Sequence, residues 1–200
     1  EWDRLKVPKR KREWLSARLV SKNLIRACVP ELEQVPFSKI QILKEPSGAP
    51  FISAGNRQRT RVGISFSHSH DHVFAVCSPD DIHFGADLER VEPRARAFIE
   101  DFFTEEEIRQ VLFSDPDQID LIATTIWSGK EAVLKALRSG LSLDTRKIEI
   151  GYTSEPSNQE GWLRLEIKSP SRLFWRREGD FVETLCILEN SEQDLHWVTI

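Results

Sequence analysis

The chain has 200 residues, of which 40% are hydrophobic and 30% are charged, and its formal net charge is −4. This composition excludes a globally disordered chain and supplies enough apolar residues for the core of one large domain or two small ones. No apolar stretch approaches the roughly 18 residues of a transmembrane helix, and no signal-peptide pattern opens the chain, so we expect a cytoplasmic protein without membrane attachment. The sequence contains no methionine, so residue 1 is not expected to be the translation start.

The three cysteines, Cys28, Cys77 and Cys186, are scattered along the chain. They are too few and too far apart in sequence for a disulfide scaffold or a zinc cluster. We therefore expect reduced thiols in the core, as in a cytoplasmic protein.

Charge is distributed unevenly along the chain. Residues 1–26 hold nine Lys and Arg against three Asp and Glu, whereas residues 80–120 hold thirteen Asp and Glu against four Arg. A basic run before a helix is either a solvated face or a phosphate-binding segment. Because the chain is acidic overall and has no zinc-finger, RNP or basic-zipper pattern, a small phosphorylated ligand is favoured over nucleic acid.

In the first half, residues 12–28 place apolar side chains at helical spacing, and Pro30 ends the predicted helix. Short strands are predicted over residues 39–43, 50–52, 62–67, 73–77 and 82–89, with a polar loop over 53–61. The sequence S-H-S-H-D is predicted to form a turn between the third and fourth of these strands.

In the second half, Thr104 and Glu107 form a capping-box pattern that opens a short helix. Residues 114–118 break it, and a longer helix is predicted over 119–137, stopping near Gly140. From residue 147 on, apolar and polar residues alternate in several runs that predict antiparallel strands. The fold class predicted is therefore α+β, compatible with two similar lobes.

Three motifs could carry chemistry, and the first is Gly85-Ala86-Asp87-Leu88-Glu89. Residues two apart in a strand point to the same side, so Asp87 and Glu89 would present two carboxylates on one face. Such a pair can hold a hard cation and leave sites for water and phosphate. A solvated edge strand explains a lone D-x-E pattern as well.

The second motif runs from Trp127 to Lys135 and reads W-S-G-K-E-A-V-L-K. Glu131 and Lys135 lie four residues apart on a predicted helix and share a face. They form either a surface ion pair or a third carboxylate for the same cation with a lysine beside it for phosphate.

The third motif is the serine- and histidine-rich segment at residues 65–72. Its side chains can donate several hydrogen bonds to a phosphate, and its alternate histidines also suggest a zinc site. No carboxylate-rich partner stands nearby, and the absence of a G-x-S-x-G elbow argues against the common hydrolase arrangement.

Together the motifs Ser67-His68-Ser69, Gly85–Glu89 and Trp127–Lys135 resemble the 4′-phosphopantetheinyl transferases of the large, surfactin-synthetase-activating type. Gly48-x-Pro50 and Phe102-Phe103 followed by Glu107 also match this family. The resemblance runs from about residue 12 to residue 143, and the last 57 residues share only strand character.

The resemblance implies two similar α/β lobes with antiparallel sheets and an active site in the cleft between them. The expected lobes are residues 1–81, with the coenzyme A-binding basic helix and the S-H-S motif, and residues 82–200, with the metal-binding and catalytic motifs. Family members transfer the 4′-phosphopantetheine arm of coenzyme A to a serine of an apo acyl or peptidyl carrier protein and release 3′,5′-ADP. A monomer would suffice, and fatty-acid, polyketide and peptide-synthetase partners remain open.

The resemblance also assigns roles to residues in the two acidic and basic motifs. Asp87, Glu89 and Glu131 would bind Mg²⁺. Lys135 would contact the pyrophosphate of coenzyme A, and Asp87, Glu131 and Lys135 form the expected catalytic group. Glu131 would take the proton of the serine, directly or through a water.

For coenzyme A, the resemblance assigns Ser67 and His68 to its phosphates and Arg12 to its 3′-phosphate. Ala49 stands where the family often has lysine, which suggests weaker coenzyme A binding unless an arginine of the loop at residues 57–61 compensates. Two alternatives remain: a Mg²⁺-dependent phosphohydrolase and a degenerate coenzyme A-binding protein. Docking of the acidic carrier is assigned to Arg90, Arg94 and Arg96 together with an exposed apolar residue nearby.

Overall fold

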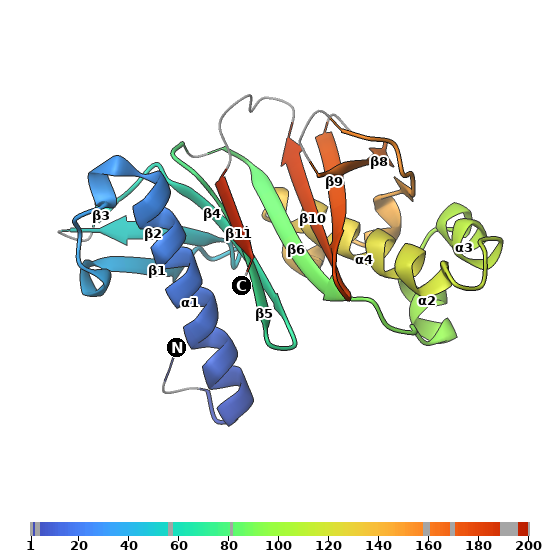
Figure 1. Cartoon of the computed structure of the whole chain (residues 1–200), viewed down its shortest axis with the longest axis horizontal. Coiled ribbons are helices and arrows are strands. Elements are labelled where there is room, and N and C mark those ends of the chain that lie inside the picture. Colours follow the sequence, from blue (N-terminus) through green and yellow to red (C-terminus); the bar gives the residue numbers. More distant parts are fainter. Residues whose placement is uncertain are drawn as a thin grey trace. The chain divides into compact units, whose positions relative to one another are not determined.

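The computed structural model describes residues 2, 5–55, 58–80, 82–157, 161–168, 171–188 and 196–199 (Figure 1). The chain divides into two compact units, one formed by Glu1–Ile82 together with Gln193–Ile200 and the other by His83–Glu192. The expected division grouped all residues from 82 to 200, whereas here the last strand belongs with the first unit. No helix in the described part of the chain has both the length and the apolar character required to span a membrane.

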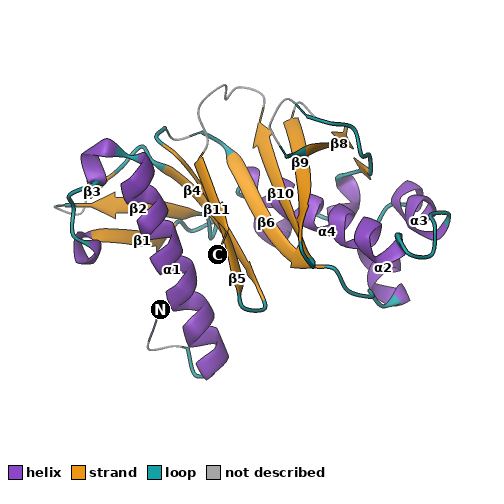
Figure 2. Cartoon of the chain, viewed as in Figure 1, coloured by secondary structure: helices purple, strands orange, loops and turns teal. Residues whose placement is uncertain are grey.

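The first unit combines one long helix with antiparallel strands (Figure 2). Helix α1 (Pro8–Cys28) packs against β4 (Gly63–Ser69) and β5 (His72–Ser78), which form a sheet in the order β11-β5-β4 with β11 (His196–Thr199). A second sheet contains β1 (Ile40–Lys44), β2 (Pro50–Ala54) and β3 (Gln58–Arg59), and short 3₁₀ helices cover Pro30–Leu32 and Phe37–Lys39. The predicted loop over residues 53–61 thus contains strand residues.

Helix α1 begins four residues earlier than predicted, at Pro8. Proline suits the first turn of a helix because its missing N–H would have no partner there. The buried side of α1 includes Val20, Leu24 and Ile25, which belong to the same apolar cluster as Ile40 and Ile52 of the sheets.

The S-H-S motif lies in a strand, so the prediction of a turn over these residues was wrong. Ser67, His68 and Ser69 are the last residues of β4, and only His70 and Asp71 turn the chain toward β5. His70 adopts a positive φ of 55°, which lets the hairpin close in two residues.

The second unit is a five-stranded antiparallel sheet with helices packed on it. The strand order is β6 (Phe84–Arg90), β10 (Phe181–Leu188), β9 (Ser171–Glu178), β8 (Leu163–Ile167) and β7 (Ile150–Gly151). Helix α4 (Ile119–Ala136) packs across β6, β10 and β9, and α2 (Arg96–Phe102), α3 (Glu105–Leu112) and the 3₁₀ helices Gly140–Ser142 and Thr145–Lys147 complete the unit. The predicted mixed α+β class with antiparallel sheets is confirmed.

The predicted capping box of α3 is confirmed. The Thr104 hydroxyl accepts a hydrogen bond from the Glu107 backbone N–H at 3.2 Å, and Glu107 Oε2 accepts one from the Thr104 N–H at 2.7 Å. These reciprocal contacts satisfy two of the helix's otherwise unpaired donors.

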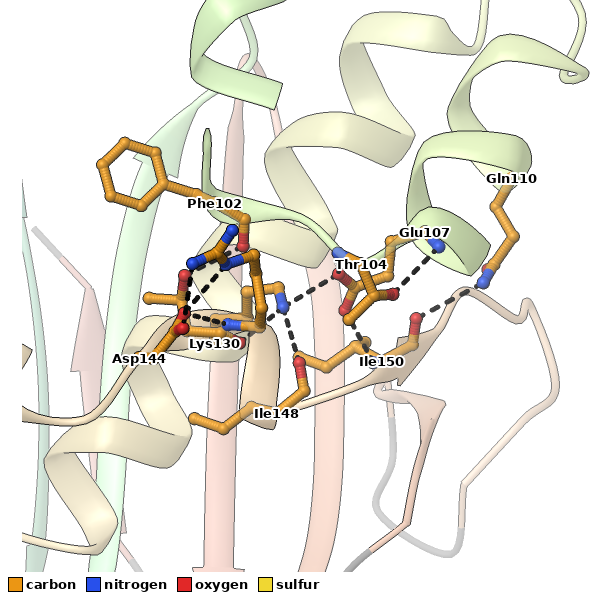
Figure 3. A network of polar contacts seen from close by, with 10 residues as sticks. Phe102, Thr104, Glu107, Gln110, Lys130, Asp144, Ile148 and Ile150 are labelled. Atoms are coloured by element: carbon orange, nitrogen blue, oxygen red, sulfur yellow. Dashed lines mark hydrogen bonds and ion pairs between the residues drawn. The ribbon is translucent and has the colours of Figure 1, made fainter. Parts of the chain in front are cut away.

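Glu107 also forms a fully buried ion pair that fixes α4 (Figure 3). Lys130 Nζ lies 2.8 Å from Glu107 Oε2 and donates to the carbonyls of Thr145 and Ile148 at 2.8 and 2.5 Å. Glu107 Oε1 accepts from the Ile150 N–H at 2.8 Å. Burial raises the pKa of Glu107 and lowers that of Lys130, while their mutual attraction opposes both shifts. The pair ties α3 and α4 to the chain over residues 145–150.

Candidate active site

A close approach between β6 and α4 brings two of the sequence motifs together. A Cβ on Gly85 would lie 2.0 Å from the carbonyl oxygen of Ala132 and 2.5 Å from the backbone nitrogen of Ala136. Real atoms do not approach so closely, so glycine is required at this crossing. Glycine here lets the strand that carries Asp87 and Glu89 lie directly against the helix that carries Glu131 and Lys135.

Asp87 is buried and receives hydrogen bonds on both of its carboxylate oxygens. Lys135 Nζ donates to Oδ1 at 2.7 Å and to the Ala86 carbonyl at 3.0 Å, and the Ser128 hydroxyl donates to Oδ2 at 2.8 Å. The Lys135 ammonium group therefore pairs with Asp87 of the strand, not with Glu131 four residues earlier on its own helix. The side chain of Lys135 stays 30% exposed, so part of it is open to solvent.

A second buried hydroxyl supports Asp87 from β10. Thr184 pairs with Asp87 in the strand register, and its Oγ1 lies 2.9 Å from the Ser128 hydroxyl. Thr184 also donates to the Ser128 backbone carbonyl at 2.9 Å. These contacts fix the rotamer of Ser128 and, through it, the plane of the Asp87 carboxylate.

Glu89 accepts hydrogen bonds from two side chains, a positively charged arginine and a neutral tryptophan. Arg94 Nη2 donates to Oε2 at 2.9 Å, and the indole N–H of Trp127 donates to Oε1 at 3.2 Å. The Trp127 ring packs edge-on against Phe98 and Phe102, with ring centroids 4.8 and 5.3 Å apart. The aromatic cluster therefore fixes the indole that orients Glu89.

Glu131 differs from the other two carboxylates because it makes no hydrogen bond or ion pair within the part of the chain that the structure describes. Burial raises its pKa, as does the charge of Asp87, while Lys135 lowers it. Burial and Asp87 likewise raise the pKa of Glu89, against the opposing effects of Arg94 and Trp127. The three carboxylates are thus close enough to repel one another.

These carboxylates do not converge on a single point in the described structure. Among the residues it describes, no group of three or more His, Cys, Asp or Glu side chains is placed so that it could hold a metal ion. Asp87 and Glu89 instead point their oxygens at Lys135 and Arg94. The chemistry of the donors suits a hard cation, because all three are carboxylates and one of them is unengaged.

The remaining predicted residues belong to the first unit. Arg12 is exposed on α1, and Ser67 and His68 are half-buried in β4. The structure thus places Asp87, Glu89, Glu131 and Lys135 in the second unit. The other residues assigned to coenzyme A phosphates, Arg12, Ser67 and His68, lie in the first.

Sequence reasoning assigned no role in the site to four residues that contribute to it: Trp127, Ser128, Thr184 and Arg94. Trp127 could have been found, because it lies four and eight residues before Glu131 and Lys135 and so shares their helix face. Arg94 was assigned to carrier docking, but its side chain is only 14% exposed and its charge is engaged by Glu89. Arg90 and Arg96 are the exposed members of that trio, with side chains 45% and 87% exposed.

The chain is similar to a family model and to several known proteins. The family model described as the 4′-phosphopantetheinyl transferase superfamily matches residues 83–186. The chain is 31% identical over 124 residues to the 4′-phosphopantetheinyl transferase psf-1 of Bacillus pumilus, covering 62% of this chain and 51% of that protein. It is 24% identical over 144 residues to the 4′-phosphopantetheinyl transferase Sfp of Bacillus subtilis, covering 72% and 59%.

A vertebrate protein matches as well. The L-aminoadipate-semialdehyde dehydrogenase-phosphopantetheinyl transferase of Xenopus laevis is 24% identical over 143 residues, covering 66% of this chain and 47% of that protein. The chain spans about half the length of the curated relatives it matches. Among solved structures, the holo-[acyl-carrier-protein] synthase of Thermotoga maritima aligns with a TM-score of 0.41 and 23% identity, covering 54% of this chain and 63% of that one.

Proposed function

Because the chain belongs to the 4′-phosphopantetheinyl transferase superfamily, we propose that it transfers the 4′-phosphopantetheine arm of coenzyme A to a serine of an apo acyl or peptidyl carrier protein and releases 3′,5′-ADP. The observation that carries the proposal is the assembly of Asp87, Glu89, Glu131 and Lys135 on β6 and α4, inside the segment that the family model matches. The two-lobe arrangement around a cleft, the monomeric state and the cytoplasmic location belong to the same proposal.

The reaction needs a base for the serine hydroxyl, and Glu131 fits that role. Its carboxylate has no internal partner among the described residues, and its pKa is raised by burial and by Asp87. A raised pKa brings a carboxylate closer to the basicity that proton transfer near neutral pH requires. Mg²⁺ held by the same carboxylate would lower this pKa, so Glu131 would take the proton more readily through one water than directly.

The reaction also needs positive charge for the pyrophosphate and the departing 3′,5′-ADP. Lys135 supplies one cation from a partly exposed position, where Asp87 and the Ala86 carbonyl hold its ammonium group. Asp87, Glu89 and Glu131 would hold Mg²⁺, which neutralises pyrophosphate charge when bound. Arg12, Ser67 and His68 would bind the more distant coenzyme A phosphates.

The test is to incubate the protein with apo carrier proteins, coenzyme A and Mg²⁺ and to measure the carrier mass. We expect a gain equal to the phosphopantetheine arm, together with 3′,5′-ADP in equal amount. Release of phosphate or 3′,5′-ADP without carrier would instead favour the phosphohydrolase. Binding of coenzyme A without transfer to any carrier would favour the degenerate protein.

Single replacements test whether the reaction takes place at this site. Asp87→Ala, Glu89→Ala and Glu131→Ala should each abolish transfer at saturating Mg²⁺, because each removes part of one charge-neutralising centre. Glu105→Ala, which removes an exposed carboxylate of α3, is the matched control and should leave transfer unchanged. Near-normal turnover in two of the three site variants contradicts a shared centre.

A further inference from the structure

The segment that follows β6 places a guanidinium group inside the acidic site. The Arg94 side chain is 14% exposed, and its guanidinium carbon lies 5.4 Å from the centre of the Phe98 ring. Nη2 donates to Glu89 at 2.9 Å, whereas Nε is buried and has no hydrogen-bond partner among the described residues. An arginine that serves only as a surface charge is not buried in this way.

The charges of the site are balanced in pairs, with one carboxylate left over. Lys135 neutralises Asp87 and Arg94 neutralises Glu89, while Glu131 has no ion-pair partner in the described part of the chain. Glu89 also accepts the Trp127 N–H on its other oxygen. Both oxygens of Glu89 are therefore occupied by donors of this chain, one of which is charged.

We propose that Arg94 is an internal counter-cation of the site, which holds Glu89 while no divalent cation is bound and which weakens the binding of that cation. The inference rests on the proposed function, because it takes Glu89 as a cation ligand. Arg94 acts as a positioning residue, since among the described residues its hydrogen bond to the site is to Glu89.

Two effects of Arg94 oppose each other, and their sizes can be compared. Its hydrogen bond orients Glu89, which favours cation binding, but its charge repels a cation at the same carboxylate. Trp127 orients Glu89 as well and would do so without Arg94. At an effective dielectric constant of about 20, like charges a few ångströms apart repel by more than the energy of a tenfold change in affinity. The repulsion therefore outweighs the loss of one of two orienting contacts.

The experiment measures Mn²⁺ binding by the electron paramagnetic resonance of the free ion and Mg²⁺ binding by calorimetry, in the full chain. Arg94→Met keeps an apolar stem beside Phe98 and removes the charge, and it should bind Mn²⁺ about tenfold more tightly than the wild type. Its melting temperature in chelator should fall below that of the wild type, and Mn²⁺ should raise it further than it raises the wild type. Arg94→Gln also removes the charge but keeps a donor for Glu89, and its Mn²⁺ affinity should rise as well. This variant replaces Arg94→Met in the test if the methionine variant does not fold.

Two controls separate charge from orientation. Trp127→Phe removes the neutral donor to Glu89 and no charge, so its Mn²⁺ affinity should not rise. Arg96→Met makes the same change of net charge at a side chain that is 87% exposed and paired with Glu100, and its Mn²⁺ affinity should equal that of the wild type.

Each other outcome overturns the proposal in an identifiable way. If Arg94→Met binds Mn²⁺ with equal or lower affinity while the wild type binds Mn²⁺ and transfers the arm, the role of Arg94 is wrong and the proposed function stands. If Arg96→Met gains affinity equally, the effect is one of net charge alone. If the wild type binds no Mn²⁺, or if Asp87→Asn does not weaken its Mn²⁺ binding, both the cation site and the role of Arg94 are wrong.

Discussion

Removing one partner of the buried Glu107–Lys130 ion pair should be among the most destabilising single changes in the second unit. The Lys130 side chain is 0% exposed, and without Glu107 its ammonium group would keep, among the described residues, the two backbone carbonyls as acceptors. The Thr104 and Ile150 N–H groups lose their acceptor as well. Breaking a buried pair on one side costs about 3–5 kcal/mol of unfolding free energy, because a charge remains buried without compensation.

Removing both charges together should cost less than removing one. Burial raises the pKa of Glu107 and lowers that of Lys130, so desolvation opposes the charged form of both groups. A Glu107→Leu and Lys130→Met double variant removes that cost, and its unfolding free energy should lie closer to the wild type than that of Glu107→Ala. The two changes should therefore be strongly non-additive in a double-mutant cycle.

Urea unfolding followed by tryptophan fluorescence measures these free energies, since the chain contains six tryptophans. Glu106→Ala is the matched control on the same helix. It breaks the Arg109–Glu106 pair, whose side chains are 61% and 49% exposed, and should cost at most about 1 kcal/mol. A Glu107→Ala cost no larger than that of Glu106→Ala would refute the reasoning.

The remaining predictions concern coenzyme A, the thiols and the carrier. His68→Ala and Arg12→Ala should weaken binding of coenzyme A more than that of dephospho-coenzyme A, and equal losses for both ligands in a calorimetric titration would reject the assignment to the 3′-phosphate. Burial raises the pKa of Cys77 and of Cys186 to about 12, so both should react with Ellman's reagent at pH 8 far more slowly in the folded than in the unfolded protein. Because the unfolded thiols lose their protons near pH 9 and the folded ones do not, the free energy of unfolding should fall as the pH rises from about 9 to about 12. Arg96→Glu should raise the KM for an acidic carrier without changing the Kd of coenzyme A, and a carrier KM indifferent to both this change and salt would place docking elsewhere.

The sequence alone predicted the features that depend on neighbouring residues. The capping box of Thr104 and Glu107 and the helix that carries Glu131 and Lys135 followed from spacing, and the strands of the second unit followed from alternation. Such signals are local, because a helix repeats every 3.6 residues and a strand every two. The family was also predicted correctly, since its motifs are short and lie at fixed positions along the chain.

Tertiary structure decided the partners of the charged side chains. Lys135 lies four residues from Glu131 in the sequence but binds Asp87, which is 48 residues away. Glu107 caps its own helix and also neutralises Lys130. Arg94 was expected on the carrier-docking surface but pairs with Glu89. Spacing along one helix or strand predicts which residues share a face. The side chains that contact this face depend on how separate elements pack. Here that packing is set by the absence of a side chain at Gly85, which lets β6 lie directly against α4.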